Sequence, residues 1–582
     1  MAVKFGIRNY SRTGNQVTFT LVALNADGSV DTSYTGNFTW GLNGVSDPGL
    51  AQFSAGDLGQ RTYTITILDP NARVGLAANF PGNITGANLS ISPPGGTPGV
   101  GFGNAGDHLM VGGAGNDTIG GNNGNDLFLM QQGGNDNVSG GGGDDGFYFG
   151  AAYTNADVVN GGAGVRDQLG LQGNYLGGVS LGSLVGVEMV VLLPGNDTRF
   201  GDTAGNVYDY NLVADAGTIV SNNRLTIQAN ALRAGEDFTF DGSASGINFL
   251  IYAGLGANVL TGGSGDDGFF FGQARFTSND VVNGGGGSDQ LGLQGNYSTR
   301  GVNPGGDVVF GANQLSGIET IVLLSASDDR FGAGGGTVRY SLTMNDGNVQ
   351  AGQQLTIQAN TLRAGEFFYF DGRQETDGTF RIFSGADGDI LHGGQGSDEI
   401  WGGAGDDSLS GHGGADILRG GAGTNSFSYR FLTDSLPGAR DQILDFKLGD
   451  TIQAHELANN TLPAFTGFRF IGGNAQTGAA QVQVIQNGTT ATVNFFIDSD
   501  NRPDLVIDLT VVDGHTLTAS AFTGLSFNEP IKHGEVAPSP GLGGKLWNND
   551  GSGAFLYLLD GPELIDGPNA LHALPGSSDL LI

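Results

Sequence analysis

Single apolar residues recur at intervals of nine positions in the glycine-rich stretches of this chain of 582 residues. Each stands two residues after an aspartate, as Ile119 follows Asp117 and Ile400 follows Asp398. This spacing does not fit the helical period of 3.6 residues. It predicts very short strands that each bury one side chain and are joined by glycine-rich turns.

The nine-residue unit follows the pattern Gly-Gly-x-Gly-x-Asp-x-apolar-x. It matches at every defined position in residues 112–120, 140–148, 262–270, 284–292, 393–401 and 402–410. This repeat is identified as the calcium-binding nonapeptide of RTX proteins. The resemblance implies a parallel β-roll with calcium between successive turns, and it implies secretion.

The physical chemistry of the unit supports that resemblance. Glycines allow a tight turn with positive φ, which other residues resist. The turn directs backbone carbonyls and the aspartate carboxylate at one point, which suits a hard cation that takes six or more oxygen ligands. Two units make one coil, so side chains that stand two units apart are expected to stack, as Asp389 with Asp407 and Asp398 with Asp416. The candidate calcium ligands are Asp117, Asp126, Asp136, Asp145, Asp157, Asp167, Asp267, Asp280, Asp289, Asp389, Asp398, Asp407, Asp416 and Asn425.

Larger repeats extend the pattern between the nonapeptide segments. Residues 144–150 return as 266–272, and residues 225–230 return as 355–360. Each copy is a nonapeptide segment followed by a strand-rich segment without nonapeptides, which we interpret as metal-free coils of the same β-solenoid.

Both ends of the chain depart from this pattern. Residues 17–24 and 61–68 read as strands by alternation or continuous apolar character, which predicts a small β-sandwich before the solenoid. Residues 441–452 and 496–509 resemble the C-terminal domain of serralysin-type proteins, which implies a β domain that caps the roll. Asp498, Asp500 and Asp504 are either a further calcium site or acids of surface turns.

The predicted fold is therefore all-β. A β-sandwich-like domain precedes a parallel β-roll or β-solenoid with calcium-binding nonapeptides, and a serralysin-like β domain caps it. The expected segments are the N-terminal domain 1–92, a linker 93–99, RTX rolls 100–170, 253–292 and 384–428, metal-free coils 171–252 and 293–383, the cap 429–527, and a tail 528–582 with a secretion signal.

Charge and composition favour calcium as the stabilising partner. The net charge is −34, and of the 58 acidic residues 48 are Asp and 10 are Glu, which indicates short ligands in turns. Without metal these turns repel one another, so we expect loose or unfolded rolls in chelator. The chain has no cysteine for disulfides and no basic patch for nucleic acid. We expect roughly eight to twelve bound Ca²⁺ ions.

Targeting signals point to export. We find no N-terminal signal peptide and no apolar stretch long enough to span a membrane. The chain ends Asp579-Leu580-Leu581-Ile582, which resembles the tail of serralysin-type substrates of type I secretion. The expected location is extracellular or at the cell surface of a Gram-negative bacterium, with the type I secretion machinery as a partner.

Catalytic motifs give no support for an enzyme. Serralysins are zinc proteases, but the His-Glu-x-x-His motif is missing, and His392 and His412 are expected to be surface residues. Residues 178–182 match Gly-x-Ser-x-Gly but lie in a repetitive β segment rather than before a helix. We therefore predict a protein that is not an enzyme.

Three functions remain after this search. The first is a non-enzymatic scaffold that self-associates in calcium as a surface layer, filament or matrix. The second is an adhesin whose N-terminal β domain binds a surface glycan, with Tyr34 and Trp40 as the only hints. The third is an extracellular enzyme, whereas a pore-forming toxin would need apolar helices.

Overall fold

The computed structural model describes residues 4–13, 16–24, 30–37, 39–43, 52–66, 74–79, 87–91, 100–102, 107–200, 205–218, 220, 222–299, 306–328, 336–454, 468–477 and 480–522. Their regular structure is almost entirely β, with three 3₁₀ turns at Ala55–Asp57, Leu432–Ser435 and Ala519–Ala521. None of the helices described is long and apolar enough to cross a membrane. The chain divides into two compact units between Gly292 and Leu293, within β27 (Gln290–Gln294).

Antiparallel strands form the N-terminal part of the first unit. The strands β1 (Lys4–Thr13), β2 (Gln16–Leu24) and β6 (Gln60–Thr66) make one sheet. A second group comprises β4 (Thr39–Asn43), β7 (Val74–Asn79) and β8 (Ala87–Ile91), and β3 (Gly36–Asn37) pairs with β5 (Gln52–Phe53). The two strands expected at 17–24 and 61–68 are thus present as β2 and β6, which pair with each other. Their alternate side chains, including Val17, Phe19 and Ile65, are fully buried.

The strand β8 joins this N-terminal part to the roll. It pairs antiparallel with β7 on one side and parallel with β10 (Leu109–Val111) on the other, with Leu89 opposite Leu109. The predicted boundary at residue 92 therefore separates two strands that are neighbours in one sheet. The predicted linker 93–99 lies outside the described residues.

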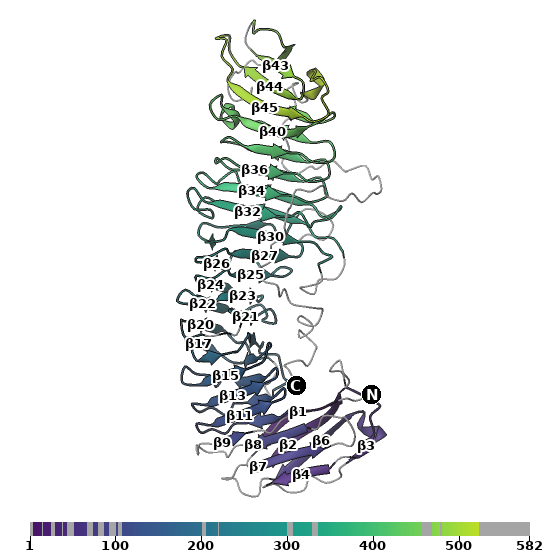
Figure 1. Cartoon of the computed structure of the whole chain (residues 1–582), viewed down its shortest axis with the longest axis vertical. Helices are drawn as coiled ribbons and strands as arrows, with labels where there is room; N and C mark the ends of the chain where they lie inside the picture. The colour runs from purple at the N-terminus through teal and green to yellow at the C-terminus, as the bar shows by residue number, and fades with distance from the viewer. Residues whose placement is uncertain are drawn as a thin grey trace. The chain divides into compact units, whose positions relative to one another are not determined.

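The rest of the first unit is built from ladders of parallel strands, to which successive coils add further strands (Figure 1). One ladder continues from β10 through β12 (Leu127–Leu129), β14 (Gly146–Gly150), β16 (Gln168–Leu171), β19 (Met189–Leu192), β21 (Arg224–Gln228), β23 (Asn248–Tyr252) and β25 (Gly268–Phe271). A second contains β9 (Val100–Phe102), β11 (Thr118–Asn123), β13 (Asn137–Gly142), β15 (Val158–Gly162) and β18 (Leu184–Val185). A third contains β17 (Tyr175–Ser180), β20 (Tyr210–Val213), β22 (Phe238–Asp241), β24 (Asn258–Thr261) and β26 (Val281–Asn283).

The second unit repeats this arrangement. One ladder contains β28 (Val308–Val309), β31 (Tyr340–Thr343), β33 (Phe368–Asp371), β35 (Ile390–His392), β37 (Ser408–Ser410), β39 (Ser426–Ser428) and β41 (Thr451–Gln453). The other contains β30 (Thr320–Leu324), β32 (Gln354–Gln358), β34 (Thr379–Phe383), β36 (Glu399–Trp401), β38 (Ile417–Arg419) and β40 (Asp441–Phe446). The short strand β29 (Leu315–Ser316) precedes β30. The parallel all-β fold predicted from the nonapeptides is therefore confirmed.

Each strand from β36 to β39 contributes one fully buried apolar side chain, as the nine-residue pattern predicts. Ile400, Leu409, Leu418 and Phe427 have no exposed surface, although the residues beside them in the strands are mostly polar. In β12, by contrast, all three residues are buried. Full burial of such a side chain contributes about 1.5–3 kcal/mol. The core is therefore a stack of single residues, and it depends on whatever keeps successive coils in register.

The ladder changes direction at the C-terminal end. Strand β45 (Leu505–Val511) pairs parallel with β40 but antiparallel with β44 (Thr490–Phe496). Strand β43 (Gln481–Asn487) pairs antiparallel with β44 and parallel with β42 (Arg469–Gly472). That this segment caps the roll, and that it is serralysin-like, stays a prediction.

Candidate metal sites

Every nonapeptide aspartate occupies the same place in the fold, directly before a short strand. From Asp126 onward, its Oδ1 accepts the backbone N–H of a residue one coil earlier in the chain. Oδ1 of Asp407 lies 2.8 Å from the backbone nitrogen of Asp389, and Oδ1 of Asp416 lies 2.7 Å from that of Asp398. Asn425 accepts from Asp407 in the same way at 3.1 Å. The stacking expected for these pairs is present, and it fastens each coil to the next.

The other candidate residues form equivalent rows with longer coils. In one row of the first unit the backbone N–H of Asp117 donates to Oδ1 of Asp136, and the backbone N–H of Asp136 donates to Oδ1 of Asp157. The spacings are 19 and 21 residues. The second row runs through Asp126, Asp145 and Asp167 at spacings of 19 and 22. Asp267 donates its N–H to Asp289, and Asp280 accepts from Asn258. None of the fourteen predicted residues is more than 2% exposed.

The second carboxylate oxygen, Oδ2, has different surroundings in different turns. In Asp157 and Asp280 it accepts the backbone N–H and the hydroxyl of Thr154 and Thr277. In Asp267 and Asp398 it accepts the N–H of a glycine in its own turn, at 2.7 and 2.6 Å. In a larger group of described residues Oδ2 is buried and has no hydrogen-bond partner. These residues are Asp126, Asp136, Asp145, Asp167, Asp407, Asp416 and Asp441. A buried acceptor without a partner is costly, so these oxygens call for a ligand.

Glycine at the first position of the unit leaves the space beside this oxygen. A methyl carbon placed on Gly402 would lie 2.5 Å from Oδ2 of Asp407 and 2.8 Å from the carbonyl oxygen of Gly420 in the next coil. At the fourth position Gly405 has a φ of +119°, which a residue with a side chain rarely adopts. Each turn thus brings a carboxylate and a carbonyl of the next coil to one small space.

Comparisons with known proteins agree with this geometry. The model of the RTX calcium-binding nonapeptide repeat (4 copies) matches residues 101–128, 250–273, 277–291, 383–418 and 392–427. The chain carries RTX repeats. Such repeats bind calcium, and in general they indicate an extracellular protein exported by type I secretion. No curated protein matches the chain.

Among solved structures, the RTX chain is similar to the solution structure of the AlgE6R3 subunit from the Azotobacter vinelandii mannuronan C5-epimerase. The identity is 20%, the match covers 35% of this chain and 96% of that chain, and the TM-score is 0.21.

The donor set of the RTX turns fits calcium. Around Gly121, Gly140, Gly262, Gly393 and Gly402 the nearest groups include a carboxylate oxygen and a carbonyl oxygen, which are the ligands that Ca²⁺ takes, whereas the side chain of Met130 lies beside Gly112. The residues that would hold the ions are the predicted aspartates and Asn425, together with the carbonyls of facing glycines such as Gly420. A bound ion neutralises the stacked carboxylates and gives Oδ2 a partner.

Burial without metal raises the pKa of these carboxyls. Loss of hydration raises the pKa of Asp136, Asp167, Asp267, Asp389 and Asp398 to about 7. The same cause raises the pKa of Asp145 and Asp407 to about 8, and neighbouring aspartates add to the increase. The metal-free fold therefore favours protonated aspartates in the RTX turns, whereas calcium binding requires ionised carboxylates.

A pH prediction follows from these shifts. The folded pKa values of about 7 to 8 lie above the ordinary value of 3.8, so the metal-free fold is stabilised at low pH. This stability is lost as the pH rises from about 4 through 8. In calcium-depleted buffer we expect the β structure of the RTX rolls, measured by far-UV circular dichroism, to be retained better at pH 5 than at pH 9. Calcium affinity should rise over the same range, and equal β signals at both pH values without calcium would contradict the assignment.

The structure adds three residues to the rows of carboxylates that sequence reasoning missed. Oε2 of Glu188 accepts the N–H of Asp167 at 3.0 Å, and the rows of the third roll continue to Asp441 and Asp450, at 2.9 and 2.8 Å. Burial and a neighbouring carboxylate raise the pKa of Asp441. A coil longer than two nonapeptides separates each of these aspartates from its partner, so a search at the nonapeptide spacing passes over them.

Two further expectations can be compared with the structure. His412 is only 4% exposed, so the prediction of a surface residue was wrong. It occupies the second glycine position of its unit with a φ of +67°, and its Nε2 lies 3.3 Å from Nδ1 of His392. Asp498 and Asp504 accept backbone N–H groups of their own turn, and a further calcium site there stays a prediction.

Proposed function

We propose that this RTX protein is a secreted, non-enzymatic scaffold that folds in extracellular calcium and then associates with further copies of itself. The observation that supports it best is the ladder of buried carboxylates, in which each coil holds the backbone of the coil before it. A stack of this kind gains stability from neighbouring coils rather than from one large core. Its formation is therefore tied to calcium along its length.

Apolar side chains on the outer face of the first unit support self-association. Val259 of β24 and Val281 of β26 lie directly opposite each other, and they are 42% and 37% exposed. Val158 of β15 and Val185 of β18 are similarly exposed, at 41% and 38%. Flat rows of parallel strands with outward valines are surfaces on which a second copy can pack.

The adhesin alternative has weaker support. Tyr34 packs edge-on against Phe53, with ring centroids 5.6 Å apart, and burial raises the pKa of its hydroxyl. This position is that of a core contact of the N-terminal sheets rather than of an exposed ligand platform. The side chain of Trp40 lies outside the described residues.

The proposed function predicts assembly that depends on calcium. Light scattering and negative-stain microscopy of the purified full chain should show single particles in chelator and regular sheets or filaments in millimolar calcium. Val259→Lys should reduce assembly, because it places a charge on the outer valine row. Val207→Lys is the matched control, since Val207 is 54% exposed but lies outside the strands. A monomer that folds in calcium and does not associate at any concentration would exclude the scaffold.

A further inference from the structure

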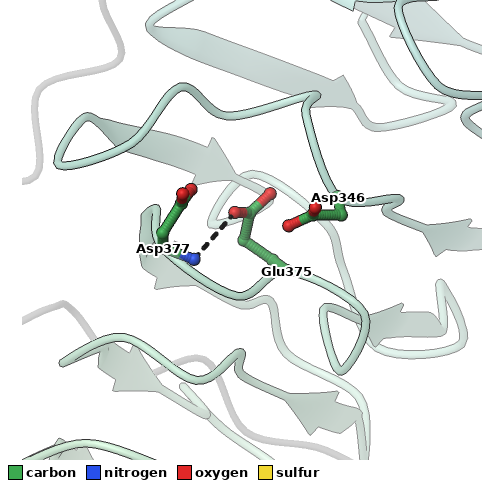
Figure 2. Close-up of side chains that lie close together, drawn as sticks. All are labelled: Asp346, Glu375 and Asp377. Atoms are coloured by element: carbon green, nitrogen blue, oxygen red, sulfur yellow. Dashed lines mark hydrogen bonds between the residues drawn. The ribbon is translucent and has the colours of Figure 1, made fainter.

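Three acidic side chains meet in the second unit, outside the nonapeptides. Asp346, Glu375 and Asp377 each bring a carboxylate oxygen within 4.8 Å of the other two, and Figure 2 shows Glu375 between the two aspartates. Asp346 follows β31, whereas Glu375 and Asp377 lie in the turn between β33 and β34. The cluster therefore joins the turns of two successive coils in a segment, 293–383, that was predicted to be metal-free.

The position of Glu375 is what distinguishes this cluster from an ordinary group of surface acids. Its side chain is fully buried, although both aspartates are exposed. Oε1 accepts the N–H groups of Asp377 and Gly378 at 3.3 and 3.0 Å. Oε2 is buried and has no hydrogen-bond partner. A buried carboxylate oxygen without a partner carries a desolvation cost, which a bound cation would offset.

The turn geometry holds these acids in place. Thr376 donates both its backbone N–H and its hydroxyl to Oδ1 of Asp346, at 3.2 and 2.7 Å. The dashed line in Figure 2 marks the bond from the Asp377 nitrogen to Glu375. The acids are thus linked through hydrogen bonds within one turn and between two turns, and Oε2 of Glu375 remains for a ligand.

The first copy of the long repeat shows that the fold does not require these acids. In the first copy the backbone N–H of Ser245 donates to the carbonyl of Gly242. In the second copy the backbone N–H of Glu375 donates to the carbonyl of Gly372 in the same way. Ser245 therefore occupies the position of Glu375. When the two copies are aligned in this way, Ala216 takes the place of Asp346. The same backbone thus forms with a small polar and an apolar residue at these positions. The carboxylates are an addition in the second copy.

We propose that Asp346, Glu375 and Asp377 bind one calcium ion, in addition to those of the RTX turns. Three carboxylates supply hard oxygen ligands with a total charge of −3, and the exposed aspartates leave room for water to complete six to eight ligands. The irregular arrangement favours Ca²⁺ over Mg²⁺, which demands near-octahedral geometry. The ion links the turn after β31 to the turn after β33. The carbonyl of Glu375 also accepts the N–H of Gln395, so this turn supports the RTX turn that precedes Asp398 in the third roll.

A crystal structure of the full chain grown in calcium tests the site directly. We expect an anomalous calcium peak bounded by the three carboxylates, with metal–oxygen distances of about 2.3–2.6 Å. A water molecule or no density at this position, in a crystal whose RTX turns hold calcium, would overturn the proposal. This result is independent of whether the protein assembles.

Calcium counting by equilibrium dialysis provides the solution test. The double variant Asp346→Ala with Glu375→Ser carries the residues of the first copy, so it is expected to fold and to lose one calcium ion per chain. Glu375→Gln, which keeps the side-chain volume, should give the same loss. Asp237→Asn is the control, because Asp237 is exposed and only accepts the N–H of Ala257. Unchanged calcium content in both cluster variants would refute the site.

Discussion

In chelator at neutral pH, we expect the RTX rolls to lose their β structure, and we expect millimolar calcium to restore it. The reason is the row of buried aspartates, of which Asp145 and Asp407 have Oδ2 atoms with no partner and pKa values raised to about 8. Extracellular calcium modules bind with dissociation constants of about 10⁻⁴ to 10⁻³ M. Millimolar calcium is about one to ten times these constants, so each site stabilises the folded state by about 0.4–1.4 kcal/mol; at 100 times the dissociation constant the gain is about 2.7 kcal/mol.

Far-UV circular dichroism of the full chain measures this effect. The β signal should fall steeply in chelator and return cooperatively on titration with calcium, because neighbouring coils share ions. Magnesium at the same concentration is the control and should restore little of the signal. An unchanged spectrum in chelator would mean that apolar stacking alone holds the coils together.

Loss of a single ladder aspartate should be the most damaging point substitution in the third roll. Asp407→Ala removes the acceptor of the Asp389 N–H, which costs about 1–3 kcal/mol when the donor stays buried. It also removes a calcium ligand, which costs about 2.7 kcal/mol in calcium at 100 times the dissociation constant. We expect a loss of about 4–6 kcal/mol in the free energy of unfolding, measured by urea denaturation in calcium.

The neighbouring residue supplies the control for this substitution. Asp406 carries the same charge but is exposed, and its Oδ1 accepts only the N–H of Thr424, at 2.7 Å. Asp406→Ala should therefore cost about 1 kcal/mol or less. Equal losses for the two variants would show that overall charge, rather than the buried ladder, sets the stability.

The ladder of buried aspartates could be predicted because each nonapeptide contains all the residues that form its own turn and strand. The glycines set the turn, the aspartate follows them within the same unit, and the apolar residue two positions later is buried, as in residues 402–410. The rows at Asp389, Asp398 and Asp407 could thus be predicted to the residue. That all fourteen bind calcium stays a prediction.

Features that depend on coil length could not be predicted in this way. Asp441 and Asp450 join the rows only because a longer coil brings them there, and Glu188 extends its longer side chain to the position of an aspartate. Glu375 and Asp346 lie on different coils, and only the stacking of these coils brings them together. The tail 528–582 and its predicted secretion signal lie outside the described residues.

Hydrogen exchange with mass spectrometry, in calcium and in chelator, tests the central claim most directly. The backbone N–H groups of Asp126, Asp136, Asp389 and Asp398 all donate to a carboxylate of the next coil. Peptides covering 107–170 and 383–428 should be strongly protected in calcium and exchange rapidly in chelator, while the sheet of β1, β2 and β6 keeps its protection in both. Equal protection of the RTX rolls in calcium and in chelator would contradict the view that calcium holds these coils together.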